Sequence, residues 1–146
     1  TYNNTTEKLD GPADKQWATY YGTASTTSAI ADAVSMQMRW YASAPTNLGY
    51  LNTNFDLLNV ASINFLASST GGLNVTVSIS IDGGSTYIAE ELFTLSGTPT
   101  TYTYNVDPTY QAQNIRVKFT LTLPETAPTS TSRLFIDSVE MLEAAQ

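Results

Sequence analysis

The sequence contains no cysteine and no histidine. Without cysteine the chain forms no disulfide, so it needs no oxidising compartment, although it is not barred from one. Without histidine it lacks the commonest general base, the commonest metal ligand and the usual partner of a nucleophilic serine. A serine hydrolase that depends on a histidine base is therefore excluded.

Paired carboxylates give little support for catalysis either. The chain has 13 Asp and Glu residues, but the close pairs, Glu90 with Glu91 and Asp10 with Asp14, are consecutive or lie in predicted loops. Neither spacing is typical of an acid–base pair. A hydrolase that uses two distant carboxylates is the alternative left open, and the sequence favours a protein that is not an enzyme.

Charged residues are also scarce, at 13% of the chain against roughly 25% in ordinary soluble domains. Lys and Arg number only six, they do not cluster, and the net charge is −7, which argues against nucleic acid as a partner. No apolar run approaches the roughly 18 residues of a membrane span. Threonine, serine and asparagine supply solubility, which is typical of extracellular β proteins. Because the sequence opens at Thr1, we expect that a signal peptide or a preceding domain has been removed.

A fault-free alternation of apolar and polar residues marks the centre of the chain. From Leu73 to Asp82, Leu, Val and Ile alternate with Asn, Thr, Ser and Asp, which predicts a β-strand with one apolar and one solvated face. Asp82–Gly83–Gly84–Ser85 then predicts a tight hairpin, and 86–95 predicts a strand running back.

About nine such strands are predicted at short, regular spacing, with no convincing helix. The 114–123 stretch repeats the central alternation, and 35–41 and 133–142 are further clear examples. This pattern predicts an all-β, antiparallel β-sandwich of the jelly-roll type. Residues 1–16 are predicted to be a loosely ordered lead-in with a short first strand around Glu7, and 17–146 a single domain. The predicted core contains Val75, Val77, Ile79, Val117, Phe119, Leu121 and Ile136.

The closing segment Leu134–Glu140 (LFIDSVE) resembles the F-I-D-D-V strand that ends jelly-roll modules related to carbohydrate-binding modules. The early Trp17 and the segments GTASTTSAI, SMQMRWY, LGYLNTNFDL, LNVTVSISIDGGSTY, IRVKFTLTLP and TSRLFIDSV resemble modules on extracellular proteins of mollicutes and related bacteria. The resemblance spans nearly the whole chain and implies a non-catalytic module appended to surface enzymes or adhesins. Ser138 departs from the pattern, because it replaces the second acidic residue of the usual ending.

The same resemblance implies a candidate structural calcium site. In many such modules an acidic residue near the first strand meets one on the last strand, and Glu7 and Asp137 occupy comparable positions here. Calcium takes six to eight oxygen ligands, which loop carbonyls and asparagine amides could complete. The alternative is that Asp137 only hydrogen-bonds a neighbouring loop.

A sugar-binding face is the second candidate site. In the 35–41 strand the apolar residues point one way, so the polar ones share the other face. If the 49–55 segment lies beside this strand, one sheet face carries an arginine, two tyrosines and three amides, which suit a polar ligand. The predicted set is Gln37, Arg39, Tyr41, Tyr50, Asn52 and Asn54. The alternative is an ordinary solvated face.

Two functions follow from these observations. The first is a non-catalytic carbohydrate-binding or adhesion module, extracellular or on a cell surface, whose partner is a glycan or cell-surface polysaccharide. The second is a structural subunit of an extracellular assembly, such as a surface filament or a phage decoration protein, which would associate with copies of itself.

Overall fold

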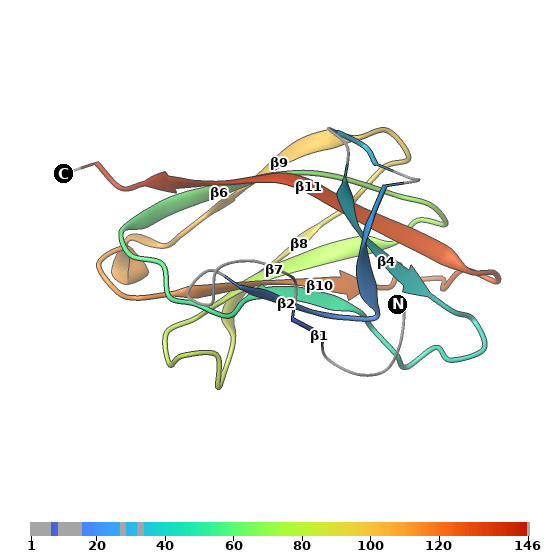
Figure 1. Cartoon of the computed structure of the whole chain (residues 1–146), viewed down its shortest axis with the longest axis horizontal. Helices are drawn as coiled ribbons and strands as arrows, with labels where there is room; N and C mark the ends of the chain where they lie inside the picture. The colour runs from blue at the N-terminus through green and yellow to red at the C-terminus, as the bar shows by residue number, and fades with distance from the viewer. Residues whose placement is uncertain (1–6, 9–15, 27–28, 32–33, 146) are drawn as a thin grey trace.

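The computed structural model describes residues 7–8, 16–26, 29–31 and 34–145, and these residues form an antiparallel β-sandwich (Figure 1). Sheet A has the strand order β1 (Glu7–Lys8), β2 (Trp17–Tyr20), β5 (Tyr50–Thr53), β10 (Arg116–Thr122), β7 (Asn74–Ser80) and β8 (Ile88–Phe93). Sheet B has the order β3 (Gly22–Ser25), β4 (Ser35–Trp40), β11 (Ser132–Glu143), β6 (Val60–Ser69) and β9 (Thr100–Asn105). The predicted fold class is confirmed.

The described residues contain eleven strands, slightly more than the nine predicted. The short first strand exists as β1, which pairs with β2, while the rest of the predicted lead-in, Gln16 apart, lies outside the described residues. Tyr21 separates β2 from β3 and takes a left-handed backbone conformation (φ 54°). The chain passes there from sheet A to sheet B. The described part includes one 3-10 turn, Pro108–Tyr110, and no helix long and apolar enough to cross a membrane.

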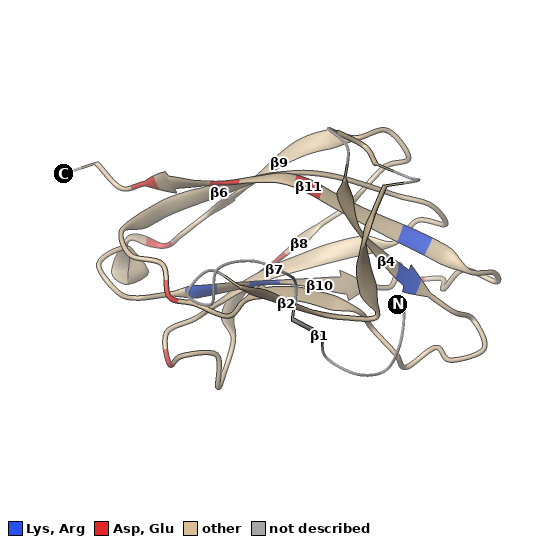
Figure 2. Ribbon diagram, in the orientation of Figure 1, with Lys and Arg blue, Asp and Glu red and all other residues tan. Residues whose placement is uncertain are grey.

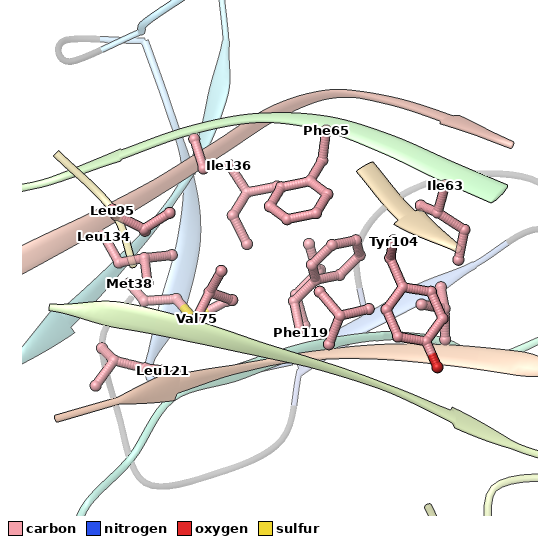
Figure 3. Packing of buried hydrophobic residues seen from close by; sticks show 14 of the residues in the cluster. Met38, Ile63, Phe65, Val75, Leu95, Tyr104, Phe119, Leu121, Leu134 and Ile136 are labelled. Atoms are coloured by element: carbon pink, nitrogen blue, oxygen red, sulfur yellow. The ribbon is translucent and has the colours of Figure 1, made fainter. Parts of the chain in front are cut away.

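The core lies between the two sheets and contains all seven residues named above as the predicted core. Val117, Phe119 and Leu121 point inward from β10, directly opposite the inward residues of β7. Phe65 of sheet B packs edge-on against Phe119 of sheet A, with ring centroids 5.1 Å apart (Figure 3). Burying such side chains stabilises a fold by about 1.5–3 kcal/mol each, so this layer carries most of the stability.

The outward face of β7 differs from the prediction, because it is polar but not solvated. Ser78 is 3% exposed and Ser80 is fully buried, whereas Ile81, predicted to point inward, is 41% exposed. At Ser80 the cause is the hairpin, because Gly84 N donates a hydrogen bond of 2.8 Å to Ser80 Oγ. Ser78 lies farther from the turn, opposite Lys118 of β10. The hairpin itself is confirmed, with Gly83 and Gly84 at φ 73° and 92°.

Asp82 organises this hairpin through its carboxylate. Its oxygens accept hydrogen bonds from Thr86 N (2.9 Å), Thr86 Oγ1 (2.6 Å) and Ser80 Oγ (2.7 Å). The hydrogen bonds from Thr86, followed by the one from the Ser80 hydroxyl, lower the pKa of Asp82 from 3.8 to about 2. The ionised carboxylate therefore holds the turn.

Asp82→Asn is expected to lower the melting temperature at neutral pH and to have no effect near pH 2. A carboxyl with a depressed folded-state pKa adds stability above its unfolded pKa, and that stability disappears as the pH falls toward about 2. Thermal unfolding of both proteins over this pH range measures the effect. A difference in melting temperature that stays constant down to pH 2 would contradict it.

Candidate ligand-binding face

The two strands that carry the predicted sugar-binding residues lie in different sheets. Strand β4 pairs with β3 and β11 in sheet B, whereas β5 pairs with β2 and β10 in sheet A. The grouping of all six residues on one sheet face is therefore wrong, because the 41–49 connection crosses between sheets instead of forming a hairpin. The set divides into Gln37 and Arg39 on the outer side of sheet B, Tyr50 and Asn52 on the outer side of sheet A, and Tyr41 and Asn54 just beyond β4 and β5.

Gln37 is not open to a ligand, since it is 2% exposed. Arg39 lies opposite Arg133 across β4 and β11 (blue in Figure 2). Asn54 is exposed and accepts a hydrogen bond of 3.5 Å from Arg116 Nη1. The binding roles of all six residues stay predictions. Tyr50, Asn52 and Asn54 lie beside residues of β10 and not beside the 35–41 strand.

Strand register brings Lys118 of β10 between Asn52 of β5 and Ser78 of β7 on the outside of sheet A. One step along, Thr120 lies opposite Tyr50, and Tyr50 in turn lies opposite Tyr20 of β2. These residues share one face because their neighbours along each strand, such as Phe119 and Leu51, point into the core. The outer face of sheet A therefore carries aromatic, amide, hydroxyl and ammonium groups side by side.

Three of these residues and Tyr87, which directly precedes β8, are linked by successive contacts and form what we call the tyrosine–lysine cluster: Tyr20, Tyr50, Tyr87 and Lys118. The rings of Tyr20 and Tyr50 stack with centroids 5.4 Å apart and an interplanar angle of 19°. Lys118 Nζ lies 4.2 Å from the centroid of the Tyr50 ring and 5.0 Å from that of Tyr87. The two rings therefore hold the ammonium group by cation–π attraction.

Partial burial changes the acid–base properties of the cluster. Desolvation lowers the pKa of Lys118 from 10.5, because burial disfavours the charged form of an amine. Desolvation also raises the pKa of Tyr87 above 10.0, outweighing the attraction of nearby Arg116 for a phenolate. Tyr87 is therefore a neutral phenol at physiological pH and can donate its hydroxyl proton in a hydrogen bond.

Arg116, the second basic residue of β10, lies in a different electrostatic setting. Its Nε donates to Asp56 Oδ1 at 2.8 Å, and the pair is partly exposed, so water screens it. This ion pair offsets the charge of the guanidinium. Arg116 and Lys118 are thus two cations on the same face of β10. A carboxylate offsets the charge of Arg116, whereas Lys118 contacts aromatic rings.

A line of rings continues from the cluster around the edge of the sandwich. Tyr20 packs edge-on against Tyr21 (centroids 4.9 Å apart), and Tyr21 packs edge-on against Tyr41 (6.4 Å). Asn47 Nδ2 donates a hydrogen bond of 2.8 Å to the Tyr21 hydroxyl. Tyr41, which was predicted to lie beside Tyr50, is thus connected to it through two other tyrosines.

Sequence reasoning missed Tyr20, Tyr87 and Lys118 as site residues. The alternation of 114–123 does place Lys118 on the outer face, but it does not say which strands lie on either side. Tyr20 and Tyr87 are far apart in the chain and carry no motif. Only the strand order, in which β10 lies between β5 and β7, shows that Lys118 lies close to tyrosines.

The two residues of the predicted calcium site also lie in different sheets. Glu7 belongs to β1, which pairs with β2, and Asp137 belongs to β11, which pairs with β4 and β6. The assumption that the first and last strands pair is therefore wrong. Among the residues that the structure describes, no three Asp, Glu, His or Cys side chains cluster as metal ligands would.

Asp137 instead holds the local backbone. It accepts a hydrogen bond from Ser35 Oγ at one oxygen and from Ser138 N (2.6 Å) at the other. Ser138 has φ 49° within a β-bulge of β11, so the carboxylate stabilises a left-handed residue. The hydrogen-bonding alternative is the one that the contacts favour, and calcium binding stays a prediction.

A recess of about 270 Å³ opens between the sheets and is lined by Trp17, Met36, Leu51, Ile136 and Val139. Four of these side chains are wholly apolar, and Trp17 adds one polar group, its indole N–H. A ligand site normally has several polar groups that fix the orientation of the ligand, and these side chains supply only that one. The outer face of sheet A is therefore the better candidate.

Comparison with known proteins finds the same fold among solved structures, although the sequence itself matches no protein family and no curated protein. Among solved structures, the chain is similar to TmCBM61 in complex with β-1,4-galactotriose, with a TM-score of 0.63, 11% identity and coverage of 88% of both chains. It is also similar to a family 29 carbohydrate-binding module complexed with mannohexaose, with a TM-score of 0.58, 18% identity and coverage of 92% of this chain and 89% of the other. At these identities the comparison establishes the shared β-sandwich fold.

Proposed function

We propose that this protein is a non-catalytic carbohydrate-binding module that holds a glycan on the outer face of sheet A. The tyrosine–lysine cluster is the observation that carries the proposal. Sugars bind to proteins through C–H contacts with aromatic rings and through hydrogen bonds to their hydroxyls. The cluster and Asn52 offer rings, phenol hydroxyls, an amide and an ammonium on one partly exposed sheet face.

Two further observations support this proposal. The structures that share the fold include modules complexed with β-1,4-galactotriose and with mannohexaose. The composition, poor in charge and rich in threonine, serine and asparagine, suits an extracellular or cell-surface location, which we propose as well.

Tyr50→Ala is expected to weaken glycan binding by about tenfold to a hundredfold, because it removes a ring that contacts both Tyr20 and Lys118. A glycan array first identifies a ligand for the wild-type protein, and isothermal titration then compares the variants. Arg39→Ala is the control, since Arg39 was also predicted to bind the ligand but belongs to sheet B.

The control separates the two faces of the sandwich. Weak binding in Tyr50→Ala with wild-type binding in Arg39→Ala supports the sheet A face, and the reverse result moves the site to sheet B. If no glycan binds and the protein elutes as a large assembly in size-exclusion chromatography, the proposed function is wrong and the structural-subunit alternative is favoured.

A further inference from the structure

Lys118 is a half-buried cation for which the described residues supply no carboxylate. Its contacts are the rings of Tyr50 and Tyr87, and the cause of its lowered pKa is desolvation. A nearby carboxylate would raise the pKa of a lysine. The charge is therefore offset by ring quadrupoles alone within the described part of the chain.

The residues opposite Lys118 on the two neighbouring strands carry no charge. Lys118 lies opposite Asn52 of β5 and Ser78 of β7, both neutral. Arg116, two residues earlier on the same strand, has Asp56 at 2.8 Å. Among the residues that the structure describes, an acid therefore lies beside one cation of β10 and none lies beside the other.

This arrangement is unusual in a chain with 13 acidic and six basic residues. Partly buried charges are unfavourable unless an opposite charge or strong hydrogen bonds compensate them. Lys118 is also held in place, because two rings confine its ammonium. A ligand that reaches the cluster therefore meets a positive charge that no carboxylate of the described residues neutralises.

We infer that Lys118 binds a carboxylate of the ligand, so that the glycan held on the outer face of sheet A contains uronic acids. The inference rests on the proposed carbohydrate-binding function and adds the chemical class of the sugar. Charge-assisted hydrogen bonds from an ammonium to a carboxylate are about twice as strong as those to neutral oxygens. Galactotriose and mannohexaose, the sugars bound by the similar structures, carry no charge, so the inferred ligand differs from both.

The test uses matched pairs of oligosaccharides that differ only in the carboxylate. Hexamers of galacturonate, mannuronate and glucuronate are each compared with the carboxyl-reduced form of the same chain by isothermal titration. We expect the wild-type protein to bind one of the uronate hexamers about tenfold to a hundredfold more tightly than its reduced form.

Lys118→Met is expected to abolish that preference, because it keeps the length and apolar stem of the side chain and removes the charge. Lys118→Arg, which keeps the charge, is expected to retain most of it. Arg133→Gln is the control, since it removes a positive charge from sheet B and is expected to change uronate affinity by less than about threefold.

The outcomes distinguish this inference from the function on which it rests. Equal binding of the uronate and reduced hexamers, or tighter binding of the reduced ones, overturns the inference and leaves a module for neutral glycans. An uronate preference that survives in Lys118→Met also overturns it. Binding of no glycan at all contradicts the proposed function itself.

Discussion

Val77→Asp is expected to unfold the protein. Val77 is fully buried at the centre of β7, directly opposite Phe119 of β10. A carboxylate at this position would lose its water without gaining a partner, which costs several kcal/mol. Domains of this kind are stable by only about 5–15 kcal/mol. Circular dichroism and thermal unfolding measure the loss.

Thr76→Asp provides the matched control one residue away. Thr76 lies on the outer side of the same strand, where its hydroxyl is 2.6 Å from that of Thr122. Losing this contact costs about 1 kcal/mol, so the variant should fold. Equal destabilisation by the two substitutions would show that the two faces of β7 are wrongly assigned.

Gly71→Ala is expected to give the second large effect, a loss of about 2–5 kcal/mol in the free energy of unfolding. Gly71 lies in the turn between β6 and β7 with φ 70°, which an L-residue adopts only with strain. A Cβ there would overlap Ser132 Oγ and lie 2.8 Å from Ser132 Cβ. Ser132 is 2% exposed at the start of β11, so it has little room to move.

Gly83→Ala separates the clash from the backbone strain. Gly83 has nearly the same φ, 73°, but a Cβ there would meet nothing within 4 Å. This variant should lose only about 1–2 kcal/mol, the cost of the left-handed conformation. Chemical denaturation of both variants gives the difference, and similar losses would mean that Ser132 moves aside.

Alternation in the sequence predicted much of the fold, because a strand with one buried face reveals that face directly. The β7 and β10 segments are the best examples, and every predicted core residue belongs to the observed core. Alternation does not predict the solvent exposure of the outer face of a strand where other parts of the chain bury it. Ser78 and Ser80 were predicted to be solvated, but both are buried, and Ser80 accepts a hydrogen bond from Gly84 in the hairpin turn.

The candidate site was harder to predict, because it depends on which strands are neighbours. Nothing in the 41–49 connection says whether it makes a hairpin or crosses to the opposite sheet. The predicted set rested on the condition that the 35–41 and 49–55 strands are neighbours, and this condition is not met. Tyrosines, an amide and a cation do meet on the outer face of sheet A, but only Tyr50 and Asn52 of the predicted set lie there beside Lys118.

The confinement of Lys118 between two rings has a kinetic consequence. A free lysine side chain samples many rotamers, and ordering it on binding costs about 1.5–2 kcal/mol of entropy. Here the Tyr50 and Tyr87 rings restrict the ammonium before any ligand arrives, so much of that loss occurs during folding. Preorganisation of this kind lengthens the lifetime of a complex more than it speeds its formation. A ligand bound through Lys118 should therefore be released slowly.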